Sequence, residues 1–185
     1  MVLLLIISVI WISSEITLSQ LMRSDTSKVD YDKCSLKIIW ITITVSIITG
    51  MMLQKTNIII LESFFSIVYY SGVGLICCGL IIRWIAILTL KKAFTVDVSI
   101  SKDQTLVKSG IYTYIRHPSY LGSLLSFLGL GIVFNNWITL TVIFLPILIS
   151  FLYRMSIEEK VLINAFGNQY REYVEHSNRL IPGIY

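Results

Sequence analysis

Charged residues are scarce in this chain. Only 14% of its 185 residues are charged, whereas 55% are hydrophobic, and the mean hydropathy is +0.77. A soluble domain of this length carries many more charged side chains on its surface. The composition therefore excludes an ordinary soluble enzyme or binding domain and predicts an all-α integral membrane protein.

Residues that hold metals or carry redox chemistry are also few. The three cysteines are odd in number, two of them are adjacent, and none belongs to a CxxC motif. The chain has only two histidines. This pattern favours small buried hydrophobic side chains over a metal or redox site, so we expect no metal.

Five apolar segments are long enough, or nearly long enough, to cross a bilayer, which takes ~20 residues. Asn135 and Asn136 join the last two segments in a tight turn, which predicts an antiparallel helical hairpin. After the hairpin, apolar residues at helical spacing predict a cytoplasmic amphipathic helix that Gly167 interrupts or caps. The five segments are Val2–Leu18, Leu36–Leu53, a stretch within Ile58–Leu90, the short Leu121–Phe134, and Trp137–Tyr153.

Basic residues are distributed unevenly between the segments. With five spans, thirteen of the fifteen lysines and arginines fall on one side, Lys55 falls on the other, and Arg83 lies within the third span. Basic loops stay cytoplasmic, so we expect the N-terminus outside, and the C-terminus and the active site on the cytoplasmic side. The net charge of +4 then reflects topology and does not indicate a nucleic-acid partner.

No soluble domain or internal repeat is visible. We expect one membrane domain over residues 1–185, with three N-terminal helices in residues 1–90 and a cofactor-binding catalytic half in residues 91–185. Phe94–Ile100 alternates like a short extended segment. Gly72, Gly74 and Gly79 sit inside an apolar helix with no preceding strand, so they favour close helix packing over a nucleotide loop.

Two polar clusters flank the hairpin. One precedes it and contains His117, and the other follows it, from Arg154 to Glu159. Because both ends of a hairpin return to the same side, residues 117–120 and 154–159 should meet in space. Arg154 and Glu158 share one helix face at i,i+4 spacing, which fits either a surface ion pair or a functional pair.

These clusters carry a family resemblance. LVKSGIYTYIRHPSYLG, followed after the hairpin by RMSIEEKVLINAFGNQYREY and a terminal RLIP, resembles the isoprenylcysteine carboxyl methyltransferase family and, more loosely, the phospholipid N-methyltransferases. The resemblance covers Phe94–Pro182. It implies a membrane methyltransferase that uses S-adenosyl-L-methionine without a Rossmann-type domain.

The resemblance also implies the site residues. Arg154 falls on the family's arginine near the acceptor and, with Glu158, is the predicted catalytic pair; Arg154 would bind the substrate carboxylate, and Glu158 would pair with the cofactor's ammonium. Apolar Leu106 and Val107 would flank adenine. The predicted cofactor contacts are Gln104, Thr105, Leu106, Val107, Tyr112, His117, Pro118, Ser119, Tyr120 and Glu158.

Several acceptors and one non-enzymatic function remain open at this point. The leading hypothesis is carboxyl methylation of a prenylcysteine-like, lipophilic or lipidated substrate that enters from the bilayer among membrane lipids. A phospholipid amine, a small thiol or a lipophilic hydroxyl is the alternative, and an amine or hydroxyl would need a base, for which Glu159 and His117 are the candidates. The third hypothesis is a non-enzymatic membrane scaffold. The sequence shows no sign of an obligate protein partner.

Overall fold

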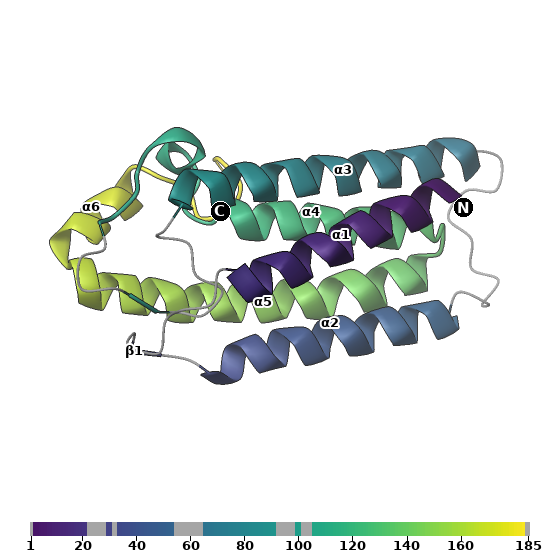
Figure 1. Cartoon of the computed structure of the whole chain (residues 1–185), viewed down its shortest axis with the longest axis horizontal. Helices are drawn as coiled ribbons and strands as arrows, with labels where there is room; N and C mark the ends of the chain where they lie inside the picture. The colour runs from purple at the N-terminus through teal and green to yellow at the C-terminus, as the bar shows by residue number, and fades with distance from the viewer. Residues whose placement is uncertain are drawn as a thin grey trace. The chain divides into compact units, whose positions relative to one another are not determined.

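The computed structural model describes residues 2–21, 29–30, 33–53, 65–91, 99–100 and 105–183, and these residues are mainly helical (Figure 1). The helices and strands, in chain order, are α1 (Val2–Leu21), β1 (Val29–Asp30), α2 (Lys33–Leu53), α3 (Phe65–Leu90), β2 (Ser99–Ile100), the 3₁₀-helix η2 (Gly110–Thr113), α4 (Pro118–Val133), α5 (Trp137–Phe166) and α6 (Asn168–Glu175).

Within the described parts of the chain, three helices are long and apolar enough to cross a membrane, namely the segments Cys34–Leu53, Phe65–Leu90 and Trp137–Phe166. Val2–Leu18 and Pro118–Val133 are shorter apolar helices. Apolar side chains such as Ile41, Ile67 and Leu88 are exposed on these helices, as is typical of surfaces that face lipid. The prediction of a helical integral membrane protein is confirmed. The predicted number of five spans is not, and the fourth predicted segment forms a shorter apolar helix.

The chain divides into two compact units. Unit 1 comprises Met1–Lys33, Trp84–Pro118 and Met155–Tyr185, and unit 2 comprises Cys34–Arg83 and Ser119–Arg154. Each unit has its own apolar interior. Ile87, Tyr112, Met155, Tyr170 and Leu180 are buried in unit 1, and Ile76, Phe127, Ile143, Ile147 and Phe151 are buried in unit 2.

Unit 2 contains the predicted hairpin, formed by α4 and α5. Asn135 adopts a positive φ of 49°, which an asparagine tolerates better than most residues. The Asn136 side-chain oxygen accepts hydrogen bonds from the backbone N–H groups of Ile138 and Thr139, so it caps the first turn of α5. Asn135 therefore reverses the direction of the chain, and Asn136 caps the start of the next helix.

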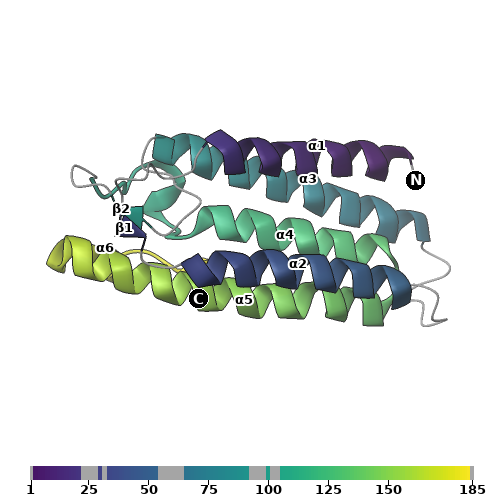
Figure 2. The ribbon, with the colours of Figure 1, turned by 60° about the horizontal axis from the view of Figure 1, so that its bottom comes forward.

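Close helix packing explains the glycines of α3. The helices α3 and α4 lie side by side in both views (Figures 1 and 2). A Cβ atom at Gly79 would lie 2.4 Å from the Gly122 carbonyl oxygen, and one at Gly72 would lie 2.7 Å from the Gly129 carbonyl oxygen. The packing interpretation is confirmed for these two glycines, whereas a Cβ atom at Gly74 would meet nothing within 4 Å.

This difference between glycines predicts a difference between alanine variants. We expect Gly79→Ala to destabilise the protein by about 1–3 kcal/mol, because the added methyl group collides with backbone that cannot move aside. Gly74→Ala is the matched control and should leave stability within about 0.5 kcal/mol of the wild type, or raise it slightly, since alanine favours helix. Thermal unfolding in detergent measures both, and equal midpoints for the two variants would contradict the packing.

Unit 1 contains most of the polar residues that flank the hairpin. It includes α1, the end of α3, η2, the part of α5 from Met155, and α6. Gly167 has a φ of 55° and separates α5 from α6, so the predicted interruption is confirmed. Ser99 and Ile100 pair in antiparallel register with Asp30 and Val29, and the rest of the expected extended segment, residues 94–98, lies outside the described residues.

Candidate functional site

A cavity of about 80 Å³ lies in unit 1. Its walls are largely apolar and aromatic, but they include one carboxylate and one guanidinium. Five of the residues predicted as cofactor contacts line it, namely Thr105, Leu106, Val107, Tyr112 and Glu158, and they are joined by Leu90, Arg116, Leu162, Phe166, Tyr170 and Tyr173. Such a combination of apolar walls and a few polar groups is typical of small-molecule sites.

Local sequence explains how one wall is built. Glu158, Leu162 and Phe166 are spaced four residues apart, so they share a face of α5. The break at Gly167 starts a new helix, α6, which supplies Tyr170 and Tyr173. The FGxxY motif therefore contributes Phe166 and Tyr170 to the wall that holds Glu158, and Tyr173 follows one turn later on α6.

The two tyrosines of α6 differ in their hydrogen bonding. The Tyr173 hydroxyl donates to the Tyr112 carbonyl oxygen at 2.5 Å. Tyr170 is 1% exposed, and its hydroxyl oxygen has no hydrogen-bond partner among the residues that the structure describes. Burial raises the pKa of Tyr173 to about 12, and burial together with Glu159 and Glu158 raises the pKa of Tyr170 even further. Both phenols stay protonated at neutral pH.

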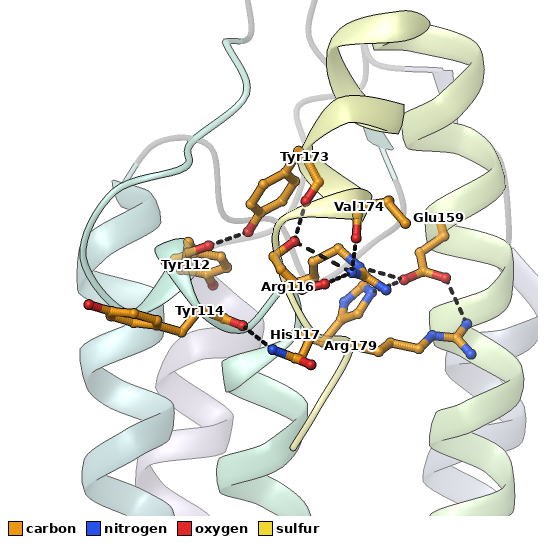
Figure 3. A network of polar contacts seen from close by, with 10 residues as sticks. Tyr112, Tyr114, Arg116, His117, Glu159, Tyr173, Val174 and Arg179 are labelled. Atoms are coloured by element: carbon orange, nitrogen blue, oxygen red, sulfur yellow. Dashed lines mark hydrogen bonds and ion pairs between the residues drawn. The ribbon is translucent and has the colours of Figure 1, made fainter. Parts of the chain in front are cut away.

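Glu159 is the centre of an ion-pair network (Figure 3). One of its oxygens lies 3.2 Å from Arg116 Nε and 3.1 Å from His117 Nε2, and the other lies 3.0 Å from Arg179 Nη2. His117 is almost fully buried. One carboxylate thus joins the residue pair that precedes α4 to an arginine near the end of the chain.

The segment Ser177–Leu180 runs beside residues 114–117. The backbone N–H groups of Arg116 and His117 donate to the carbonyl oxygens of Asn178 and Arg179, at 2.8 and 3.2 Å. The Asn178 N–H donates back to the Tyr114 carbonyl at 2.9 Å, and Arg116 also donates to the Ser177 carbonyl (Figure 3). The C-terminal segment is therefore part of the scaffold that fixes Arg116 and His117.

Arg154, the residue predicted to bind the acceptor, is buried in unit 2. Its exposure is 3%, and it donates to the Tyr120 hydroxyl at 3.1 Å and to Ser35 Oγ at 2.7 Å. The Tyr120 ring packs edge-on against Phe151, one turn earlier on α5, with 5.4 Å between the ring centroids. These contacts from α2, α4 and α5 hold the guanidinium in one orientation.

A second arginine of unit 2, Arg83, binds the start of α4. Its Nη1 donates to Ser119 Oγ at 3.0 Å and to Ser123 Oγ at 2.8 Å. Polar partners of this kind lower the cost of placing an arginine in an apolar helix. Ser119, a predicted cofactor contact, is therefore engaged with Arg83, and its neighbour Pro118 is the fully buried first residue of α4.

The structure brings the two predicted clusters together. His117 meets Glu159 in unit 1, and Tyr120 meets Arg154 in unit 2, so the expected meeting of residues 117–120 with 154–159 is confirmed. Gln104 lies outside the described residues. Sequence reasoning missed the cavity residues Arg116 and Tyr170 and the network residue Arg179, although RHPSY, FGxxY and RLIP contain all three.

Comparisons with known proteins agree with the resemblance. Residues 72–164, half of the chain, match the model of the isoprenylcysteine carboxyl methyltransferase (ICMT) family. The protein-S-isoprenylcysteine O-methyltransferase of Schizosaccharomyces pombe is 33% identical over 122 residues, which cover 65% of this chain and 52% of that protein. The enzyme of the same name from Tribolium castaneum is 35% identical over 120 residues, which cover 63% of this chain and 43% of that protein.

A solved structure is also similar. It is that of a eukaryotic intramembrane Ras methyltransferase, an isoprenylcysteine carboxyl methyltransferase, with a TM-score of 0.62 and 28% identity over 76% of this chain and 52% of that chain. The chain spans about half the length of the curated relatives it matches. Because the family match takes in most of α3, the HPSY segment and α5 as far as Asn164, this membrane protein belongs to the isoprenylcysteine carboxyl methyltransferase family.

Proposed function

We propose that the protein is a methyltransferase that uses S-adenosyl-L-methionine to methylate the carboxylate of a lipophilic, prenylcysteine-like acceptor. The observation that carries this proposal is the cavity of unit 1, which is lined by apolar side chains, by Glu158 and by Tyr170, whose buried hydroxyl has no partner among the described residues. Family membership supports the same activity.

The lining residues fit the proposed cofactor. S-adenosyl-L-methionine has an adenine, which suits apolar neighbours such as Leu106 and Val107, and a charged amino-acid group, which suits Glu158. The Tyr170 hydroxyl offers a buried donor that nothing in the described protein uses. Thr105 and Tyr112 complete the proposed cofactor contacts in the cavity, and we keep Gln104 and residues 117–120 as proposed contacts outside the cavity lining.

The chain's own residues have a limited chemical task. The cofactor, when bound, supplies an electrophilic methyl group on a sulfonium. The protein must then hold the acceptor oxygen in line and exclude water. We propose that Arg154 binds the acceptor carboxylate through its planar guanidinium, which the hydroxyls of Tyr120 and Ser35 already orient. A carboxylate is deprotonated at neutral pH and needs no base.

The state of the candidate bases favours a carboxylate acceptor over an amine or a hydroxyl. Glu159 contacts three cationic or protonatable groups, and His117 Nε2 faces Glu159 itself. A base must be within hydrogen-bond reach of the proton it removes, and both groups are already directed at protein partners. Their geometry therefore gives no support to methylation of an amine.

The membrane setting supports a lipophilic acceptor. The chain is an integral membrane protein, so we propose that the acceptor's lipid part enters from the bilayer and that the site lies on the cytoplasmic side, where most basic residues are expected. We also propose that residues 91–185 form the catalytic half of a single membrane domain.

Binding of S-adenosyl-L-methionine tests the proposal. We expect purified wild-type protein in detergent to bind it saturably in a calorimeter, and Glu158→Gln to weaken binding by about 10- to 100-fold, because a charge-assisted hydrogen bond to the ammonium is lost. Glu172→Gln is the control on the exposed face of α6 and should bind like the wild type. A folded wild-type protein that binds no S-adenosyl-L-methionine would overturn the proposed function.

A further inference from the structure

We propose that Tyr170 is a cofactor-binding residue whose hydroxyl donates a hydrogen bond to the α-carboxylate of S-adenosyl-L-methionine, beside the positive charge of Arg116. The inference rests on the proposed function and deepens it. It assigns a role to the tyrosine of the FGxxY motif.

The first support is the state of the Tyr170 hydroxyl. The side chain is 1% exposed and lines the cavity, and the hydroxyl oxygen is buried with no hydrogen-bond partner among the described residues. Buried polar groups are nearly always paired, because water can no longer satisfy them. A ligand in the cavity would supply the missing acceptor.

The second support is that two hydrogen-bond donors, Tyr170 and Arg116, line the same cavity. Tyr170 is a neutral donor at physiological pH, because burial and the charges of Glu159 and Glu158 raise its pKa. Arg116, whose positive charge also acts on the Tyr170 phenol, lines the same cavity. Both groups are hydrogen-bond donors, from which a carboxylate can accept, although Glu159 and Glu158 act on the same phenol with the opposite charge.

The third support is the complement of charges in the cavity. Glu158 provides a negative group and Arg116 a positive one, and Tyr170 adds a neutral donor. The amino-acid group of the cofactor is a zwitterion and needs this combination. Its ammonium would pair with the Glu158 carboxylate, and its own carboxylate would accept hydrogen bonds from the Arg116 guanidinium and the Tyr170 phenol. Since Glu158 is assigned to the ammonium, the carboxylate is the group left for Arg116 and Tyr170.

Tyr173 offers a matched control three residues away. It lies on the same helix, lines the same cavity and packs edge-on against Tyr170, with 5.9 Å between the ring centroids. Its hydroxyl, however, donates to the Tyr112 carbonyl within the protein. Removal of the Tyr170 hydroxyl should therefore weaken ligand binding, whereas removal of the Tyr173 hydroxyl should lower the stability of the ligand-free protein.

The experiment compares Tyr170→Phe and Tyr173→Phe with two ligands and without ligand. Calorimetry measures the affinity for S-adenosyl-L-methionine and for its decarboxylated form, which keeps the ammonium and lacks the carboxylate. We expect Tyr170→Phe to weaken binding of S-adenosyl-L-methionine by about 10- to 100-fold and to change the affinity for the decarboxylated form by less than about two-fold. Without ligand, Tyr170→Phe should unfold at or above the wild-type temperature, and Tyr173→Phe below it.

Three results would overturn the inference while the proposed function stands. One is wild-type affinity for S-adenosyl-L-methionine in Tyr170→Phe. Another is an equal loss for both ligands, which would place Tyr170 against the ammonium or the nucleoside. The third is a ligand-free Tyr170→Phe protein as unstable as Tyr173→Phe, which would mean that the hydroxyl is paired within the protein. If the folded wild type bound neither ligand, the proposed function itself would fail, and the inference with it.

Discussion

Glu159→Ala is expected to destabilise the protein by about 3–5 kcal/mol, because it leaves three basic side chains, all of them at least partly buried, without their carboxylate. Arg116, His117 and Arg179 all contact Glu159, and the His117 side chain is only 3% exposed. Taking one partner from a buried pair costs more than the pair itself contributes, since the remaining charge stays out of water. Thermal unfolding in detergent should show the midpoint falling by roughly 6–20 °C.

Two further variants make this test specific. Glu159→Gln keeps the size of the side chain and one acceptor oxygen, so we expect it to lose less stability than Glu159→Ala. Glu175→Ala removes an exposed glutamate from α6 and should change stability by no more than about 0.5 kcal/mol. If Glu159→Ala unfolded at the same temperature as Glu175→Ala, the network would have no structural role.

The same network predicts how the C-terminal segment behaves. Glu159 contacts Arg179 at 3.0 Å, and Ser177–Leu180 is otherwise held by backbone hydrogen bonds to residues 114–117. Loss of the ion pair should make this segment easier to cleave by carboxypeptidase in Glu159→Ala than in the wild type. This measurement separates a loosened C-terminal segment from a general loss of stability, because it is made well below the unfolding temperature.

Arg154→Ala is expected to lower kcat/KM for a farnesylated cysteine with a free carboxylate by about 10²- to 10³-fold, if Arg154 binds that carboxylate. The loss should be smaller in Arg154→Lys, which keeps the charge but not the planar, two-pronged donor geometry. Methyl transfer from radiolabelled S-adenosyl-L-methionine at several acceptor concentrations measures both variants.

Binding of S-adenosyl-L-methionine separates this role from misfolding. Arg154 also donates to Tyr120 and Ser35, so its removal disturbs α2, α4 and α5 as well as the acceptor. A folded Arg154→Ala protein should still bind the cofactor with an affinity within about two-fold of the wild type. Arg171→Ala, on the exposed face of α6, is the control for loss of a positive charge. If Arg154→Ala had the same kcat/KM as the wild type, the proposal that Arg154 binds the acceptor carboxylate would be wrong.

The local features of the fold could be predicted because each depends on neighbouring residues. Asn135 and Asn136 between two apolar segments determine the hairpin, since so short a connection permits only antiparallel helices. Gly167 ends α5, because glycine adopts the positive φ that other residues avoid. The hairpin in turn brings residues 117–120 to residues 154–159, which is why the two pairs His117–Glu159 and Tyr120–Arg154 form.

The identity of each partner within these clusters could not be predicted in the same way. Glu158 and Glu159 are adjacent, and spacing alone does not tell which one faces the cavity and which one binds His117, because both directions are available to neighbouring residues on a helix surface. Arg179 lies 20 residues beyond Glu159, after a change of helix direction at Gly167, so no periodicity connects them.

Three properties could be inferred from the amino-acid sequence alone: that the chain is a helical membrane protein, where its last two apolar segments turn, and which family it belongs to. Hydropathy, turn residues and motifs are local properties of a chain. Three features follow from tertiary packing alone: Glu159 contacts two arginines and a histidine, Ser177–Leu180 packs beside residues 114–117, and Tyr170 lines the cavity with a hydroxyl that has no partner among the described residues. Those contacts depend on how distant segments pack, and packing sums many weak interactions that no single stretch of sequence contains.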